Sequence, residues 1–449
     1  MPTEKKTVKS FYVENLGCSK NQVDAEIMIA SLIKKGWSFS DSPDDAACII
    51  VNTCGFIESA KKESIETTLS YRELYPGKKI LMAGCFAQRY GKDLQKELPE
   101  VDGVFGNRDP GRVPEIMDLL EGEEHALMIP SAGSTYFERD KLLSFPGTAF
   151  VKISEGCSHG CSYCAIPLIR GALRSRPADE IVQEIASLLE KGVIEINLIA
   201  QDLAAFGTDR GGRSEFPGLL KEISKLKGDF WIRLLYIYPD NFPFEILETL
   251  RDDPRFLPYF DVPFQHADGK VLEAMGRKGN KKKYLELLSK IREVLPNPVI
   301  RSTFMIGFPG EGKKEREELL SFIGEAQLDW AGFFVYSREE NTKAYRMRNA
   351  FSHNMAVKAA EKFLPLLEKK QEDITIKRME RFAGMEMDIL VEENVEGDPF
   401  SFGRGFLQAP EVDGSTVILT DRVKPGDVVR CRIVRSNGID LEALPTDEV

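Results

Sequence analysis

The chain has 449 residues, of which 42% are hydrophobic, and this length and composition suit about three folded domains. Its formal net charge of -11 at pH 7 excludes a protein that holds nucleic acid mainly through a basic surface, because Lys and Arg side chains that neutralise phosphates supply most of that affinity. No apolar run is long enough to span a membrane and residues 1–6 lack the apolar segment of a signal peptide, so we expect a cytoplasmic protein with no membrane partner.

Short apolar strands alternate with amphipathic helical patterns between residues 10 and 120. This alternation predicts a parallel α/β domain of the flavodoxin-like kind. The strands are expected at residues 10–14, 47–51, 79–83 and 103–105, and the helices at residues 24–35, 57–75, 86–97 and 110–121.

Three of the eight cysteines follow the ends of these strands: Cys18, Cys54 and Cys85. The carboxyl ends of parallel strands share one edge of a sheet, where ligands bind, so three thiols placed there can converge. A glycine adjoins each cysteine and allows a tight turn or the close approach of a bulky ligand. The pattern predicts a metal centre, since thiols in a chain without an export signal serve as reduced thiols or metal ligands more often than as disulfides.

Unrelated buried thiols are the alternative interpretation of these cysteines, because free cysteine is a common core residue. That interpretation fits Cys48 and Cys431, which lie inside apolar strand patterns. It fits the three strand-end cysteines poorly.

A linker rich in helix and strand breakers at residues 130–134 precedes a six-fold alternation of strands and helices. This pattern predicts an open (β/α)6 partial TIM barrel with its active site at the carboxyl ends of the strands. The strands are expected at residues 149–154, 194–199, 231–237, 259–262, 298–306 and 330–336.

A loop at residues 155–167 follows the first of these strands and carries Cys157, Cys161 and Cys164. Three cysteinates are one fewer than a closed zinc site or an ordinary cubane cluster takes, so one metal position stays open for a ligand. Structural zinc is the alternative, but a zinc ribbon usually has two Cys-x-x-Cys pairs and no second pair lies nearby in sequence. We do not expect His159 to be a ligand, because a fourth protein ligand would close the site.

Polar and glycine residues follow the later strands at the edge where the active site is expected. For each of them, core packing or surface polarity is the competing interpretation. These residues are Gln201, Asp202, Tyr238, Gln265, His266, Gly307, Gly310 and Glu311. Arg170, Arg174 and Arg176 follow the cysteine loop, and the sequence leaves open whether they contact substrate or form a solvated face.

The tail begins with a helical pattern over residues 355–379, which we expect to break near Pro365. Alternation then predicts a small five-stranded antiparallel barrel, with strands at residues 387–391, 401–405, 416–419 and 427–431. Residues 382–449 contain six basic and fourteen acidic side chains. A surface of that sign repels phosphate and attracts a strongly basic protein.

The spacing Cys-x-x-x-Cys-x-aromatic-Cys, with Tyr163 as the aromatic residue, resembles the signature of the radical S-adenosylmethionine (SAM) enzymes. The resemblance implies a 4Fe-4S cluster whose open iron binds SAM and splits it into a 5′-deoxyadenosyl radical. It also implies which residues contact the cofactor: Tyr163, Gln201, Gln265, Gly307, Gly310 and Glu311.

Other stretches resemble the methylthiotransferases of that superfamily. They are residues 17–24, 52–57 and 84–90, together with pieces of a TRAM barrel at 403–405 and 424–427. The resemblance implies that Cys18, Cys54 and Cys85 hold a second 4Fe-4S cluster. Ala25 stands where members of the family often carry Ser, which does not affect the ligands. The implied domains are residues 8–122, the radical SAM core at 143–373 and the TRAM domain at 376–449.

Within the family, residues 20–24, 198–202, 264–267 and 274–278 resemble the branch that methylthiolates the β-carbon of an aspartate in ribosomal protein S-twelve. The implied mechanism uses SAM twice, once to methylate a sulfur on the amino-terminal cluster and once to make the radical. It implies no catalytic residue beyond the cluster ligands, and a flavodoxin- or ferredoxin-type electron donor. A transfer RNA adenosine methylthiotransferase and an iron-sulfur electron carrier or redox-sensing adaptor remain the alternatives, and RNA binding is not expected to be primary.

Two independent sets of three thiols predict about eight irons and eight sulfides in the anaerobically reconstituted protein. Replacing the second set (Cys157→Ala, Cys161→Ala and Cys164→Ala) should lower the iron content to about half, because the first set keeps its own cluster. Iron and sulfide analysis checks this. Loss of all iron from the triple variant would show that the two sites are not independent.

Overall fold

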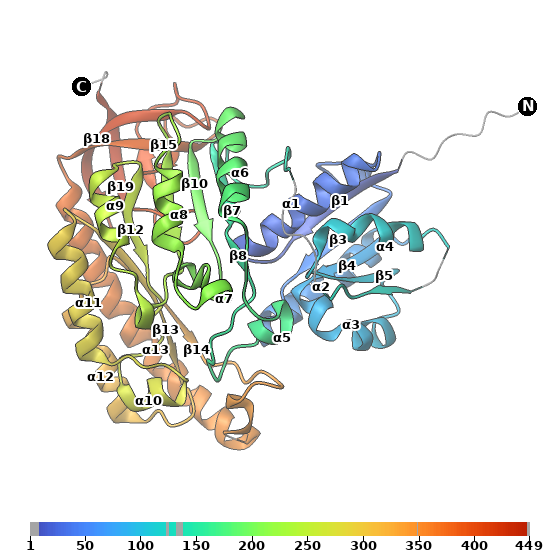
Figure 1. Ribbon diagram of the computed structural model, residues 1–449, viewed down its shortest axis with the longest axis horizontal. Helices are drawn as coiled ribbons and strands as arrows, with labels where there is room; N and C mark the ends of the chain where they lie inside the picture. Colours follow the sequence, from blue (N-terminus) through green and yellow to red (C-terminus); the bar gives the residue numbers. More distant parts are fainter. Residues whose placement is uncertain (1–8, 123–124, 132–137, 348, 447–449) are drawn as a thin grey trace, which may run out of the picture. The chain divides into compact units, whose positions relative to one another are not determined.

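The computed structural model describes residues 9–122, 125–131, 138–347 and 349–446, and the chain divides into two compact units (Figure 1). The first unit comprises residues 1–143, 155–158 and 164–176, and the second comprises residues 144–154, 159–163 and 177–449. The chain start at residues 1–6 and the linker residues 132–134, both used in the sequence predictions, lie outside the described residues.

The first unit contains a six-stranded parallel sheet of order β2-β1-β3-β4-β5-β6. This is the flavodoxin-like order with one strand added, so the predicted fold is confirmed. The strands are β1 (Ser10–Asn15), β2 (Ser38–Phe39), β3 (Cys48–Thr53), β4 (Lys79–Gly84), β5 (Gly103–Gly106) and β6 (Ala126–Met128). The helices are α1 (Ser19–Lys34), α2 (Glu58–Leu74), α3 (Cys85–Glu97) and α4 (Val113–Leu119).

Alternate residues of the central strands feed two separate cores, one on each face of this sheet. In β3, Cys48 and Ile50 pack with α1 and α4, whereas Ile49 and Val51 pack with α2 and α3. A strand that is buried on both faces has a continuous run of apolar residues, and this run is what predicted β3 from the sequence. Cys48 is a core thiol, as expected.

The second unit contains a six-stranded parallel sheet in which β7 and β14 form the two edges. The order β14-β13-β12-β11-β10-β7 follows the chain, so the predicted partial barrel is confirmed. The strands are β7 (Thr148–Lys152), β10 (Glu195–Ile199), β11 (Trp231–Leu235), β12 (Phe256–Asp261), β13 (Val299–Ile306) and β14 (Trp330–Val335).

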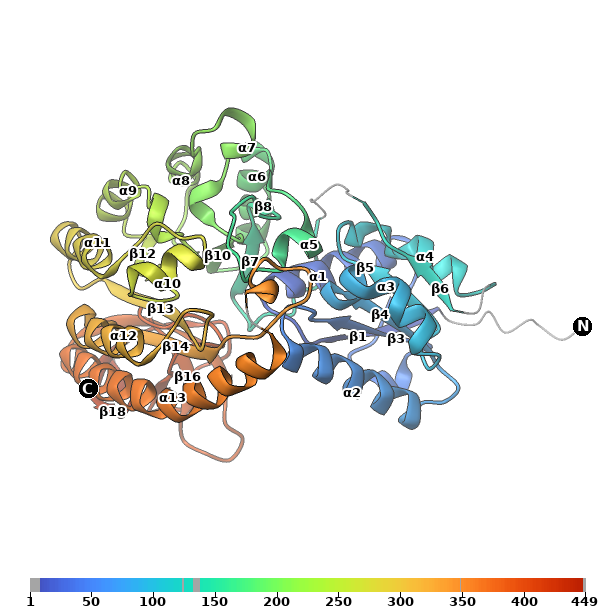
Figure 2. The same ribbon diagram turned by 90° about the horizontal axis from the view of Figure 1, so that it is seen from below.

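Helices connect these strands, and Figure 2 shows α6, α8, α9, α11 and α12 arrayed along one side of them. The longer ones are α6 (Ala178–Glu190), α8 (Phe216–Ile223), α9 (Ile246–Asp252), α11 (Lys281–Val294) and α12 (Lys313–Ala326). The shorter ones are α7 (Thr208–Gly211) and α10 (Gly269–Ala274). Helix α5 (Ile166–Arg170) and strand β9 (Arg174–Ser175) belong to the first unit, and β9 pairs with β8 (Ser154–Glu155).

The predicted helix break at Pro365 is wrong, because α13 (Ala350–Met379) continues through this residue. Pro365 is exposed, whereas Ala360, Leu367 and Gln371 are buried. A proline on the solvent side removes one backbone hydrogen bond. The packing of the opposite face holds the helix together on both sides of it.

The tail folds into a closed five-stranded barrel of order β15-β16-β17-β19-β18. The prediction of a purely antiparallel barrel is wrong at one pair, since β17 and β19 run parallel. Strand directions can alternate around a closed ring only if the number of strands is even, so a ring of five must contain one parallel pair. The strands are β15 (Glu386–Asn394), β16 (Ser401–Arg404), β17 (Thr416–Ile418), β18 (Val428–Asn437) and β19 (Asp440–Pro445).

Buried charges join this barrel to the amino-terminal ends of the parallel strands. Glu195, the first residue of β10, accepts hydrogen bonds from Arg233 Nε at 2.8 Å and from Arg404 Nη2 at 2.6 Å. Arg404, from β16, also pairs with Glu392 of β15. The barrel therefore covers the end of the sheet opposite the carboxyl ends, as Figure 1 shows for β15 and β18.

A second group of contacts extends this junction across the other strands. The Tyr259 hydroxyl of β12 donates to Asp413 Oδ2 at 2.5 Å, and Arg301 of β13 pairs with the same carboxylate at 3.3 Å. Trp330 Nε1 of β14 donates to the Leu407 carbonyl at 2.8 Å. The loop between β16 and β17 thus supplies partners to polar groups that the sheet buries.

Arg404→Met should lower the free energy of unfolding at pH 7 by about 3–5 kcal/mol, because it leaves buried Glu392 without its cation and Glu195 with Arg233 alone. Burial alone would raise the pKa of Glu195, but Arg404 and Arg233 outweigh it and lower the pKa to about 2. The native interaction therefore stabilises the protein above the carboxyl's unfolded pKa of about 4.3 and fades as the pH falls towards 2.

Urea denaturation at pH 7 and below pH 4 checks this, and the difference between wild type and variant should shrink in acid. Arg430→Met is the matched control, because Arg430 is exposed on the same barrel and pairs with Asp388 at 3.3 Å. Equal loss from both variants would contradict a special role for the buried network.

Candidate functional site

Three thiols follow the carboxyl ends of β1, β3 and β4 in the first unit. Cys18 caps the start of α1, Cys54 follows β3 directly, and Cys85 is the first residue of α3. The strand order reverses between β1 and β3, and such a switch point is where open α/β sheets bind ligands. The structure therefore places these cysteines where the sequence analysis expected them.

The electrostatics show that the three thiols are neighbours. Burial first, and then the thiolates of Cys18 and Cys54, raise the pKa of Cys85 to about 12 against the opposing charge of Arg170. Burial also raises the pKa of Cys54, with Cys18 as a further cause. Burial raises the pKa of the core thiol Cys48 to about 12 as well, so these three cysteines differ from it by their place at the strand ends and not by their pKa.

Glycines bring the backbone close at two of these turns. A Cβ on Gly55 would lie 2.6 Å from Phe86 Cα, so the turn after β3 packs directly on the start of α3. Gly84 has a φ of 98° and would place a Cβ 2.5 Å from the Thr53 carbonyl oxygen. Any larger residue at either position would separate Cys54 from Cys85.

Polar side chains surround the Cys85 sulfur. The thiol donates to Asn21 Oδ1 at 3.1 Å, Asn107 Nδ2 donates to the sulfur at 3.1 Å, and Arg170 Nη2 lies 3.5 Å from it. Asn21 and Asn107 were not among the sequence predictions. Two nitrogen donors, from Asn107 and Arg170, would favour a thiolate here, whereas Asn21 Oδ1 accepts from the thiol form.

The second set of cysteines begins after a tight turn at Gly156. This glycine has a φ of 74°, and a Cβ there would lie 2.2 Å from the Ala172 carbonyl oxygen. The Cys157 amide donates to the Gly171 carbonyl at 3.1 Å, and the Ile166 amide lies 3.5 Å from Cys164 Sγ. The backbone of residues 155–172 is therefore pinned around Cys157 and Cys164, which belong to the first unit.

Cys161 belongs to the second unit and lies against an aromatic side chain. The Tyr238 hydroxyl is 3.7 Å from Cys161 Sγ, and the Arg277 guanidinium stands 4.3 Å from the centre of the Tyr238 ring. A cysteine that binds a metal has no proton, so only the tyrosine can then donate. Arg277 lies within residues 274–278, and no individual role was predicted for it.

His159 is engaged by the protein and stacks on the same tyrosine. Its Nε2 lies 2.7 Å from Asp202 Oδ2, and its ring lies 4.2 Å from the Tyr238 ring at an angle of 12°. Asp202 Oδ1 accepts from the Tyr238 and Ala204 amides. This arrangement supports the expectation that His159 is not a ligand and gives Asp202 a positioning role.

Each cysteine of a four-iron cluster binds a different iron, so such cysteines are spaced more widely than the ligands of one ion. In the described part of the chain, no three His, Cys, Asp or Glu side chains lie close enough to hold a single metal ion.

Buried amides without partners mark the carboxyl half of the second sheet. Among the residues that the structure describes, neither amide atom of Gln201 has a hydrogen-bond partner, nor does Gln265 Oε1. Asn197 is fully buried inside β10, and neither of its amide atoms has a hydrogen-bond partner among the described residues. Each such group costs about 1–3 kcal/mol if it stays unpaired, so water or a bound molecule can supply the missing partner. The residues present therefore fit SAM or the substrate.

Gln265 also has a strained backbone, with a φ of 69°. Its amide donates to the Thr303 carbonyl at 2.8 Å, and its carbonyl accepts from Met305 at 2.7 Å, so β13 holds it in this conformation. Strain of this kind persists at ligand sites where the surrounding structure imposes it.

The predicted SAM residues after β13 form a closed turn. Gly307 and Gly310 have φ values of 79° and 95°. Glu311 Oε2 accepts from the Gly307 amide at 2.7 Å, and Oε1 pairs with Arg316 at 3.0 Å. Both carboxylate oxygens are thus occupied, which favours a positioning role for Glu311.

Two further predicted residues lie near this turn. His266 is buried, and its Nδ1 accepts from the Asp268 amide at 3.0 Å. Burial lowers the pKa of His266 to about 4, so it is neutral at pH 7. The Tyr163 ring meets the Phe308 ring edge-on at 6.3 Å.

The arginines after the cysteine loop do not form a solvated face. Arg170 and Arg176 are buried, and Arg174 Nη1 donates to the Arg170 carbonyl at 3.1 Å. Arg170 makes ion pairs with Asp24 and Glu155. That interpretation of the sequence is wrong because these side chains pack inward.

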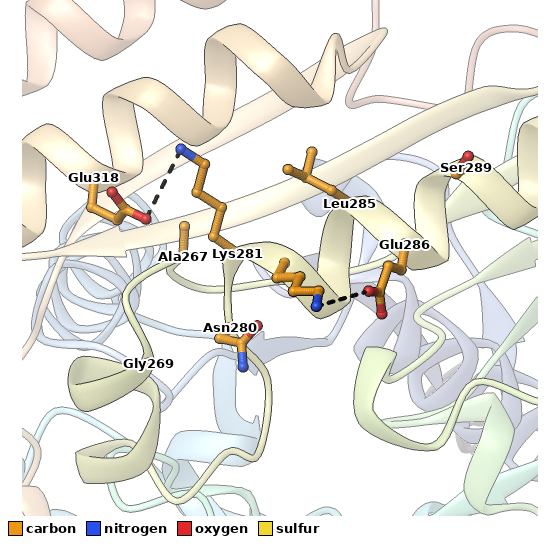
Figure 3. A pocket seen from close by; sticks show the side chains of 9 residues that line it. Ala267, Gly269, Asn280, Lys281, Leu285, Glu286, Ser289 and Glu318 are labelled. Atoms are coloured by element: carbon orange, nitrogen blue, oxygen red, sulfur yellow. Dashed lines mark ion pairs between the residues drawn. The ribbon is translucent and has the colours of Figure 1, made fainter.

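A cavity of about 640 Å³ lies elsewhere, beside α10, α11 and α12 (Figure 3). Lys281 and Glu318 pair across it at 3.9 Å, and Lys282 and Glu286 pair at the same distance along α11. None of the predicted site residues lines it, and it opens to solvent. We therefore regard it as a surface groove separate from the candidate site.

The chain matches three known families along its length. Residues 10–106 match a family described as Uncharacterized protein family UPF0004, residues 151–323 match the Radical SAM superfamily, and residues 383–445 match the TRAM domain. These ranges contain both sets of cysteines and the closed barrel.

Two relatives match almost the whole chain. It is 43% identical to a protein of Treponema denticola named ribosomal protein uS12 methylthiotransferase RimO, over 95% of this chain and 99% of the relative. It is 39% identical to a protein of the same name from Syntrophomonas wolfei subsp. wolfei, over 95% of this chain and 98% of the relative.

A solved structure shares the fold. The radical S-adenosylmethionine methyltransferase TsrM from Kitasatospora setae, with tryptophan substrate and a SAM analogue bound, has a TM-score of 0.55 and 15% identity over 72% of each chain. At that identity the likeness concerns architecture alone.

Gln201→Leu should weaken SAM binding by about tenfold or more while leaving the unliganded protein at least as stable, because the native amide finds its partners in the ligand. Anaerobic equilibrium dialysis and thermal unfolding measure the two quantities. Gln371→Leu is the control, because Gln371 Nε2 already donates to the Leu328 carbonyl at 2.9 Å. It should lose stability and keep SAM affinity, and the same pattern in both variants would contradict a ligand role for Gln201.

Proposed function

The chain belongs to the RimO family of ribosomal protein uS12 methylthiotransferases, and from this premise we propose that it adds a methylthio group to the β-carbon of an aspartate in uS12, the small-subunit ribosomal protein S-twelve. It is a radical SAM enzyme that transfers a sulfur group and uses 4Fe-4S clusters and SAM. The proposal rests on two separate sets of three cysteines in one chain. The similarity of this chain to the relatives named above extends over nearly its full length.

We assign the metal ligands by their position. One cluster would be held by Cys18, Cys54 and Cys85, and the other by Cys157, Cys161 and Cys164. When bound, these clusters and SAM supply the radical that removes hydrogen from the substrate carbon and the methylated sulfur that replaces it. The separation of the two sets along the chain supports two different uses of the cofactor.

The remaining site residues bind and orient. The unpaired amides of Gln201 and Gln265 would hold polar groups of SAM at the carboxyl ends of β10 and β12. Asp202 fixes His159, whose ring supports Tyr238 beside the Cys161 sulfur. Glu311 keeps the Gly307 turn in place, so that backbone groups there can approach the ligand.

The charge of the tail supports a basic protein as partner. Arg404, Glu392 and Asp413 are buried, which removes one cation and two carboxylates from the tail's surface, so the surface stays acidic. An acidic surface attracts a basic ribosomal protein and disfavours RNA as the primary partner. We infer a flavodoxin- or ferredoxin-type electron donor, because a radical SAM cluster must be reduced before it cleaves SAM.

The two alternative functions from the sequence have less support. The relatives described above bear the name of a ribosomal protein methylthiotransferase, not of a transfer RNA enzyme or an electron carrier. The described residues include no helix that is both long and apolar enough to cross a membrane. We place the enzyme in the cytoplasm with its ribosomal substrate, and we retain residues 8–122, 143–373 and 376–449 as its domains.

Cys54→Ala should abolish methylthiolation of uS12 but leave reductive cleavage of SAM, because the second cysteine set makes the radical without the first. Anaerobic incubation with uS12, SAM and dithionite, followed by mass spectrometry of the protein and assay of 5′-deoxyadenosine, measures both reactions.

Cys48→Ala is the matched control, because Cys48 begins β3, the strand that Cys54 follows, but packs in the core. This variant should retain both reactions. Efficient modification of transfer RNA by the wild type, or loss of SAM cleavage in a folded Cys54→Ala variant with its second cluster loaded, would overturn the proposal.

A further inference from the structure

We propose that Arg170 is a positioning residue for the amino-terminal cysteine set, orienting the Cys85 sulfur and supplying a fixed positive charge beside it. The inference rests on the proposed function, because it assumes that Cys85 ligates a cluster. It assigns a role to an arginine that the sequence left open.

The guanidinium of Arg170 is buried and touches four groups of the first unit. Nη1 donates to both oxygens of Glu155, at 3.1 and 2.9 Å. Nη2 lies 2.8 Å from Asp24 Oδ2, 2.8 Å from Asn21 Oδ1 and 3.5 Å from Cys85 Sγ. Glu155 and Asp24 thus hold the guanidinium through its two terminal nitrogens, and Nη2 also faces the sulfur.

The charges around this site require a cation. Asp24 and Glu155 are both buried, and a ligating Cys85 would add a third negative charge beside them. Arg170 is the cation that the structure places among them. Arginine suits the position better than lysine, because its planar fork can meet two carboxylates and a sulfur with fixed N–H directions.

The backbone of Arg170 is anchored as firmly as its side chain. It is the last residue of α5 and precedes Gly171, which has a φ of 79°. Arg108 Nε donates to the Ile169 carbonyl at 2.8 Å. Ala165 and Ile169 pack with Cys85 in one apolar cluster.

This arrangement links two parts of the sequence. Glu155 precedes Cys157 by two residues, and α5 begins two residues after Cys164. The segment that carries these cysteines therefore also supplies the cation for Cys85. Hydrogen bonds and positive charge at a ligating sulfur raise the reduction potential of an iron-sulfur cluster, so Arg170 should keep the amino-terminal cluster easier to reduce.

The test measures the midpoint potential of the amino-terminal cluster by redox titration followed by electron paramagnetic resonance. The background is the Cys157→Ala, Cys161→Ala, Cys164→Ala variant, in which only that cluster remains. Arg170→Gln should lower the potential by about 59 mV or more, which is a tenfold change in the ratio of reduced to oxidised cluster for one electron. Arg170→Lys keeps the charge but not the planar guanidinium, so its midpoint potential should lie between those of the background and of Arg170→Gln.

Arg139→Gln is the matched control, because Arg139 is an equally buried arginine that pairs with Glu26 of the same helix α1. Its cost in stability should resemble that of Arg170→Gln, but the potential should not change. If Arg170→Gln binds no iron while Arg139→Gln does, the midpoint potential of the Arg170→Lys variant is the test. A lowered potential in it supports the proposal, and a wild-type potential overturns it.

An unchanged potential in an iron-loaded Arg170→Gln protein would overturn the inference and leave the proposed function intact. Failure of the parent background to bind iron at the amino-terminal cysteines would instead contradict the proposed function. The two failures are therefore distinguishable.

Discussion

Both sheets consist of parallel strands whose faces are covered, so side chains that must meet a ligand lie beyond the strand ends. In the first unit this constraint collects Cys18, Cys54 and Cys85 around the reversal of strand order. In the second unit the same constraint places Gln201 and Gln265 beyond the ends of β10 and β12. The connecting helices can vary without moving these positions, because the register of the parallel strands sets where each chain segment leaves the sheet.

The two ends of the second sheet have different chemistry. At the amino-terminal end, Glu195, Arg233 and Arg404 satisfy one another, and the closed barrel seals them from water. Towards the carboxyl end, Asn197 and Gln201 remain without protein partners among the described residues. Protein groups complete the hydrogen bonds at the first end, whereas among the described residues they leave the amides of the second end for another partner.

Sequence patterns predicted most of the fold, because buried strands and strand-end cysteines depend on local order along the chain. They failed where a distant contact decides the structure. β2 is two residues long and exists through its pairing with β1, and the first turn of α1 is polar yet buried, so neither gives a periodic signal. Pro365 is tolerated because its helix packs on the opposite face. Arg170 ends the short helix α5 in a stretch whose sequence is typical of polar surface, and only the tertiary structure reveals its partners.

The bond between Glu195 and Arg404 joins residues 209 positions apart. A ribosome adds about 5–20 residues per second, so Glu195 emerges on the order of 10–40 s before Arg404. During that interval Arg233 is the one of its two cations that has been made, and the barrel cannot yet cover the amino-terminal end of the second sheet. The strands of the flavodoxin-like sheet are complete within the first 128 residues, although the buried carboxylates Asp24 and Glu26 of this unit also wait for later cations, Arg170 and Arg139. Synthesis of this chain therefore passes through a stage in which a finished first sheet precedes a parallel sheet that only the last strands can seal.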